Sequence, residues 1–157
     1  MRTARFALVI ASLVATACAS DGTSGPSINS PITAGLSAVV STAPVGSVSD
    51  PNVTMRVSVT SALPEMVSGG VCAQVVEGRS PSGSTWTDVT STSFACSAVA
   101  LSLAPGATAS ITAAADQAKI RTLVGSGSTV VLRARSALFG ASGSYALVSN
   151  EVTYQLP

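Results

Sequence analysis

The chain has 157 residues, a formal net charge of +1 and no histidine. This length fits one domain with appendages, and the near-neutral charge excludes the strongly basic surface that nucleic-acid binding requires. Charged residues make up 10% and aromatic residues 4% of the chain, whereas average proteins contain roughly 25% charged residues; a composition rich in Ser, Thr, Gly, Ala and Val therefore favours many short strands over helices.

Residues 1–18 have the pattern of a targeting segment. A positively charged start is followed by a short apolar run, Phe6–Val14, and by the small residues Ala15-Thr16-Ala17 before Cys18. The apolar run is shorter than the ~20 residues that a membrane-spanning helix requires. The segment therefore predicts export rather than a transmembrane anchor.

The four positions Ala15-Thr16-Ala17-Cys18 resemble a bacterial lipoprotein signal. The resemblance implies that Cys18 becomes the N-terminal residue and receives a diacylglycerol group, which would attach the protein to a membrane. Ala19, rather than Asp, follows this cysteine, and by resemblance to Gram-negative sorting this implies the outer membrane. An ordinary secretory signal cut at Ala17 or Ala19 is the alternative.

Residues 19–33 are rich in Gly, Ser and Pro and predict a flexible tether. One folded domain is expected to cover the remaining residues, 34–157. Without Arg2 and Arg5 the mature chain has six basic and seven acidic residues, so no polybasic patch for anionic lipid is expected.

Alternation of apolar and polar residues predicts a series of strands in the domain. In chain order the expected strands lie around Leu36–Val40, Val53–Val59, Gly70–Glu77, Thr85–Thr90, Val99–Leu103, Ala107–Ala113, Val130–Arg135, Tyr145–Val148 and Val152–Leu156. The third is apolar on both faces, which predicts a central position. The last two are interpreted as one bent strand interrupted at Ser149-Asn150.

A short helix is expected near residues 114–124, because Ala, Gln, Lys and Arg favour helices. Strand spacing of roughly 8–12 residues is typical of an antiparallel sandwich. The predicted fold class is thus all-β, an antiparallel β-sandwich of about 7–9 strands.

Cys72 and Cys96 form an even pair in a chain predicted to be exported, so a structural disulfide is the expected state. A bridge closing a loop of ~25 residues would contribute about 3–3.5 kcal/mol in the chain-entropy model. A redox or metal-binding thiol pair is the alternative. No CxxC spacing occurs, and without histidine a zinc site would need carboxylates.

The order Cys72, Trp86, Cys96 is similar to that of immunoglobulin domains, in which a tryptophan packs on the disulfide between the sheets. Residues 34–157 resemble the immunoglobulin-like sandwiches of bacterial envelope lipoproteins, through the strand rhythm, Leu103-Ala104-Pro105-Gly106 and Gly143-Ser144-Tyr145. The immunoglobulin cysteines lie farther apart than this pair. The bridge is therefore expected between neighbouring strands, or between a strand and the following loop.

No catalytic constellation is found in the sequence. The absence of histidine excludes Ser-His-Asp and Cys-His mechanisms, and the seven acids show no convergent spacing. Lys119, the one lysine, is interpreted as a solvated side chain rather than part of a Ser-Lys pair. Asp50 and Asn52 are interpreted as an Asp-Pro-Asn turn rather than a calcium site. We expect no enzyme activity, no cofactor and no metal.

Two features are candidate binding determinants. Arg56, Arg133 and Arg135 are expected on outward strand faces, where they either solubilise the domain or meet an acidic partner. Trp86 is either a core residue on the disulfide or an exposed anchor. The expected function is a non-catalytic, lipid-anchored envelope module that mediates protein–protein interaction or structural support; the alternative is a ligand- or glycan-binding domain that uses the loop around Trp86.

Overall fold

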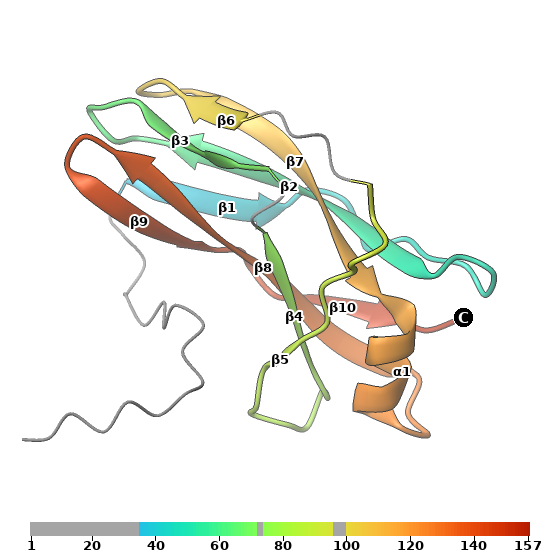
Figure 1. The fold of residues 1–157 in the computed structure, drawn as a ribbon. Coiled ribbons are helices and arrows are strands. Elements are labelled where there is room, and N and C mark those ends of the chain that lie inside the picture. Colours follow the sequence, from blue (N-terminus) through green and yellow to red (C-terminus); the bar gives the residue numbers. More distant parts are fainter. Residues whose placement is uncertain (1–34, 72–73, 96–99) are drawn as a thin grey trace, which may run out of the picture.

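The alternating residues form two antiparallel sheets that pack face to face. The computed structural model describes residues 35–71, 74–95 and 100–157, and these form ten strands and one short helix (Figure 1). One sheet has three strands in the order β1-β2-β7, and the other has seven. The predicted all-β sandwich is therefore confirmed. Within the described ranges no helix is long and apolar enough to cross a membrane.

The three-stranded sheet follows the clearest sequence pattern. It contains β1 (Leu36–Val40), β2 (Asn52–Ser61) and β7 (Thr108–Asp116), all paired antiparallel. Apolar residues at every second position of β2 are buried, and polar residues such as Arg56 alternate with them on the outer face. The period of two places one apolar face against the other sheet.

The seven-stranded sheet is built around β8 (Thr129–Gly140). One edge of β8 pairs with β3 and β4, and the other pairs with β9 and β10. Two outer strands complete the sheet, β6 on β3 and β5 on β4. The remaining bounds are β3 (Val67–Gly70), β4 (Val75–Arg79), β5 (Thr87–Asp88), β6 (Ala100–Leu103), β9 (Gly143–Val148) and β10 (Val152–Gln155).

The prediction of a single strand at Gly70–Glu77 is wrong. Ser68 pairs with Phe139 of β8, and Val75 pairs with Arg135. Seven positions therefore separate the two residues on one side of the ladder, but only four separate their partners on β8. This mismatch interrupts the ladder, so β3 and β4 pair with β8 separately. The expected central position is correct for β4, which lies between β5 and β8.

The predicted helix is present as α1 (Gln117–Val124). Asp116 caps it, because its carboxylate accepts hydrogen bonds from the backbone N–H groups of Ala118 (2.8 Å) and Lys119 (3.2 Å). Gly125 ends it with a φ of 59°, in the left-handed region that favours glycine. Residues 114–116, which were included in the predicted helix, continue β7 instead.

The predicted interruption at Ser149-Asn150 separates β9 from β10, which both pair with the same edge of β8. Ser149 is buried, and its hydroxyl accepts a hydrogen bond from the Ala134 N–H (2.8 Å) and donates one to the Asn150 carbonyl (2.9 Å). The serine side chain thus satisfies backbone groups that the break in the ladder would leave unpaired.

The two sheets also meet at both sides of the sandwich. A parallel bridge joins Ala38 to Ser149, and the Val40 N–H donates to the Asn150 side chain at 2.7 Å. On the other side an antiparallel bridge joins Thr90 to Ala115. A continuous core of Val, Leu, Ile and Ala side chains lies between these two seams.

Leu132 is central to this core, and its side chain is fully buried. Leu132→Ala should lower the free energy of unfolding by about 2–5 kcal/mol, because it removes buried apolar contacts and leaves a cavity. Urea titration followed by circular dichroism measures this change. Val39→Ala, at a position that is 51% exposed, is the control and should change stability by less than ~0.5 kcal/mol; equal effects would contradict the assignment of the core.

Candidate functional site

Charged side chains and one tryptophan lie together on the outer face of the seven-stranded sheet, over β4, β8 and the start of β10. Alternation places Val76 and Leu132 in the core and turns the neighbouring residues of both strands outward. We call this group the arginine–tryptophan cluster. It consists of Glu77, Arg79, Trp86, Arg133, Arg135 and Glu151.

Glu77 holds two of the arginines. It lies directly opposite Arg133 in the register of β4 and β8, and its Oε2 accepts from Arg133 Nε and Nη2, both at 2.8 Å. Its Oε1 accepts from Arg135 Nη1. The Glu77 side chain is 9% exposed and each arginine side chain 23%. These charge-assisted hydrogen bonds are therefore partly shielded from water, which strengthens them.

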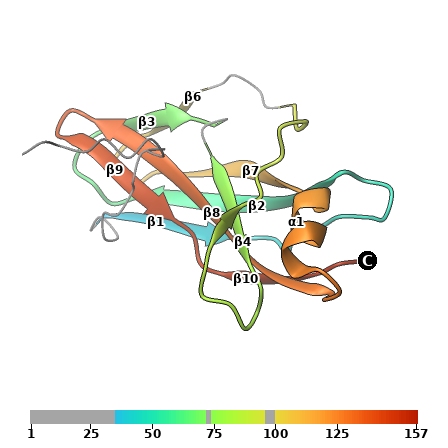
Figure 2. The same cartoon turned by 60° about the horizontal axis from the view of Figure 1, so that its bottom comes forward.

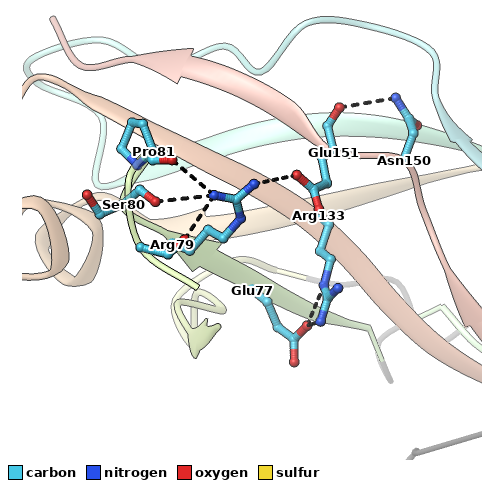
Figure 3. Close-up of polar contacts among 8 residues, drawn as sticks. Glu77, Arg79, Ser80, Pro81, Arg133, Asn150 and Glu151 are labelled. Atoms are coloured by element: carbon cyan, nitrogen blue, oxygen red, sulfur yellow. Dashed lines mark hydrogen bonds and ion pairs between the residues drawn. The ribbon is translucent and has the colours of Figure 1, made fainter. Parts of the chain in front are cut away.

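Arg79 connects the turn after β4 to the opposite edge of the sheet. Its guanidinium donates to Glu151 Oε2 at 2.7 Å and to the carbonyl oxygen of Pro81 at 3.2 Å (Figure 3). It also donates to the carbonyl oxygen of Gly83 at 3.1 Å. Glu151 immediately precedes β10, so this contact spans β8. The arginine thereby fixes the turn that leads to Trp86.

Trp86 lies against the arginines rather than in the hydrophobic core. The guanidinium carbon of Arg133 is 3.9 Å from the centroid of the indole ring, and that of Arg79 is 5.2 Å away. The residue is half-buried. Both distances are within the range of cation–π contacts. Trp86 is therefore not part of the described apolar core, and any contact with the cysteine pair lies outside the described residues.

The structure brings together only two of the three predicted arginines. Arg133 and Arg135 share the outer face of β8, whereas Arg56 lies exposed on β2 in the other sheet. Sequence reasoning missed Glu77, Arg79 and Glu151 as their partners. Glu77 and Arg79 are two residues apart, so a strand places both on one face, but strand order was needed to pair them with β8.

The six described carboxylates all accept hydrogen bonds that support the fold. Asp50 accepts from the Asn52 N–H at 2.8 Å, which confirms the predicted turn, and Asp88 accepts from the Thr90 N–H at 2.8 Å. Asp116 caps α1, and Glu77 and Glu151 bind arginines. In the part of the chain that the structure describes, no three His, Cys, Asp or Glu residues group as metal ligands would.

Glu65, the remaining acid, joins the loop after β2 to the hairpin between β8 and β9. Its carboxylate accepts hydrogen bonds from the Tyr145 hydroxyl and, at 3.1 Å, from the Ser142 N–H. The hydrogen bond from Tyr145 lowers the pKa of Glu65, and the same bond raises the pKa of Tyr145. Both shifts are those expected when a hydrogen bond favours the ionised carboxylate over its protonated form.

The predicted lipidation residue and disulfide pair are not placed by the structure. Cys18, Cys72 and Cys96 lie outside the described residues, and both of their assignments remain predictions.

Comparisons with known proteins give no family. No family model and no curated protein matches the chain. An X-ray structure of a Northeast Structural Genomics Consortium target is similar with a TM-score of 0.48 and 8% identity, over 78% of this chain and 88% of that one. A Bordetella pertussis protein provisionally called ApaA has a TM-score of 0.47 and 14% identity, over 78% and 94% of the two chains. Neither similarity carries information about function.

The cluster should contribute to stability mainly through Glu77. Glu77→Gln leaves the two partly buried arginines without a counter-charge and should lower the free energy of unfolding by about 1–3 kcal/mol. Glu151→Gln is the matched control, because it removes the same charge from a side chain that is 49% exposed; it should cost less than ~1 kcal/mol. Urea titration compares the two, and a larger loss in Glu151→Gln would contradict the assignment.

The Glu65 contact should make stability depend on pH in the acid range. The folded-state pKa of Glu65 lies below its ordinary value, so its stabilisation is present above the ordinary value and is lost as pH falls through the folded pKa. Thermal unfolding of the wild type and Glu65→Gln, measured from pH 7 to pH 2, tests this. The gap in melting temperature between the two should narrow towards acid pH; a constant gap would contradict the titration of this carboxylate.

Proposed function

We propose that the chain is a non-catalytic, lipid-anchored module of the bacterial cell envelope that mediates protein–protein interaction or structural support. The pattern Ala15-Thr16-Ala17-Cys18 after an apolar run supports the anchor. It resembles a lipoprotein signal, and the expected outer-membrane location follows from that resemblance. The paired Cys72 and Cys96 fit an exported, oxidised domain.

One observation carries the non-catalytic part of this proposal: the described carboxylates are used to hold the fold together. Acid–base catalysis requires a carboxyl group that is free to exchange a proton with a substrate. Here the carboxylates accept hydrogen bonds from arginines, from backbone N–H groups or from a tyrosine hydroxyl.

The sheet topology supports an interaction role. β7 is one end strand of the three-stranded sheet, and β6 is an end strand of the other. The last residues of β7, 114–116, already bond to residues 89–91, so only its first part has a free edge. End strands can pair with an added strand from a partner, since their outward N–H and C=O groups face away from the sheet. A protein partner that adds a strand is thus a mode of binding that this architecture can support.

The contacts of Trp86 weigh against the ring as a platform for a sugar. Sugar binding by stacking requires an open ring face, but the Arg133 guanidinium lies 3.9 Å from the ring centroid. We therefore place a glycan-binding role second to the interaction module.

The test is an intact mass and a thiol count on full-length chain isolated from the membranes of a Gram-negative host. The wild type should begin at Cys18, carry acyl chains and show no reactive thiol, and Cys18→Ala should leave the membrane fraction without acyl mass. Ser20→Ala is the neighbouring control and should stay acylated. A stable partner that co-elutes with the detergent-solubilised wild type would support the interaction role.

Two results would contradict the proposal. A wild-type chain without acyl mass would remove the anchor. Two reactive thiols at Cys72 and Cys96 would remove the structural disulfide and make that pair the leading candidate for chemistry.

A further inference from the structure

One end of the sandwich gathers the start of β1 and three loops. The Ala62 N–H donates to the Gly35 carbonyl at 2.6 Å, and the Gly106 N–H donates to the Ser61 carbonyl at 2.8 Å. The Ser142 N–H reaches Glu65 at 3.1 Å. We call this surface the tether end; it comprises Gly35, residues 62–66, residues 104–107 and residues 139–145. Figures 1 and 2 both show β1 starting beside the β8–β9 hairpin, with α1 and the C-terminus at the opposite end.

The tether end exposes two large apolar side chains. Met66 is 62% exposed and Phe139 is 58% exposed. They lie on neighbouring segments, because Ser68, two residues after Met66, pairs with Phe139 in the register of β3 and β8. Exposed apolar side chains that gather at one place commonly mark a protein or membrane contact.

The same end is nearly free of charge. Residues 62–66, 104–107 and 139–145 contain one charged side chain, Glu65, and its carboxylate is already bound by Tyr145 and Ser142. Charged residues are instead frequent at the opposite end, where the turn before β2 contains Asp50, the N-cap of α1 is Asp116, and α1 contains Lys119 and Arg121. The two ends therefore differ in charge, although the segment before β2 also exposes apolar side chains, Val45 (67%) and Val48 (75%).

The position of this surface relative to the proposed lipid anchor favours the membrane as its occupant. If residues 19–34 form the predicted flexible tether, their r.m.s. reach would be roughly 20–24 Å, which is shorter than the roughly 40 Å length of the twelve-residue strand β8. A chain anchored at Cys18 and entering the domain at Gly35 therefore holds this end closest to the bilayer.

We propose that the tether end contacts the lipid surface, with Phe139 and Met66 entering the boundary between headgroups and acyl chains. This inference rests on the proposed lipid anchor. The domain is then oriented with α1 and the C-terminus pointing away from the membrane, where a partner can reach them.

The experiment uses full-length acylated chain reconstituted into vesicles of phosphatidylethanolamine and phosphatidylglycerol, with and without brominated acyl chains. Phe139→Trp combined with Trp86→Phe places one indole at the tether end. Its fluorescence should fall about twofold in brominated vesicles, since bromine quenches an indole at the acyl boundary. The wild type, with Trp86 on the arginine–tryptophan cluster, is the control and should change little.

Hydrogen exchange tests the same contact without any substitution at the tether end. Backbone amides of residues 62–66 and 139–145 should exchange more slowly in the acylated, vesicle-bound chain than in Cys18→Ala in buffer, and those of α1 should not differ.

Absence of both quenching and protection in a chain that sediments with the vesicles would overturn this inference and leave the anchor intact. Protection that requires native membranes and is absent in protein-free vesicles would also overturn it, in favour of a protein contact. Loss of acylation or sedimentation would instead refute the proposed function.

Discussion

The long strand β8 is the element on which the seven-stranded sheet depends. Four strands pair along its two edges, β3 and β4 on one side and β9 and β10 on the other. Its inward residues fill the core, and its outward residues include Arg133 and Arg135. Because each partner strand covers only part of its length, breaks in the partners are tolerated where β8 itself stays continuous. Ser149 shows how such a break is accommodated, through a side chain that replaces a ladder hydrogen bond.

On the outer face of the same strand, several of the few charged residues of the chain neutralise one another. Three arginines and two carboxylates meet there, and they are joined by ion pairs and by contacts with one indole ring. Glu77 is the most shielded member, and each arginine that it binds keeps part of its surface in water. The cluster therefore orders the turn after β4 and the start of β10. Its charged groups bind one another, so they are not free to bind a ligand.

Local patterns predicted local structure well. The alternation in Val53–Val59 and Val130–Arg135 reappears as buried and outward faces, and the helix-favouring run near Lys119 forms α1. The prediction failed at Gly70–Glu77, because a mismatch in register with a distant strand divides that segment. It also failed to bring Glu77 to Arg133, since these residues are 56 positions apart and their contact depends on strand order, which no local pattern encodes.

The antiparallel pairing of β1 has a mechanical consequence for an anchored protein. Tension between the N-terminal segment and the opposite end of the domain would act along β1, whose hydrogen bonds to β2 run across the strand. All five register pairs from Leu36 to Val40 would then resist the pull together, rather than opening one after another. The bond from Val40 to Asn150 adds a further attachment at the far end of the strand. With the proposed anchor, this pairing would join the N-terminal segment to the domain in the geometry that best withstands shear.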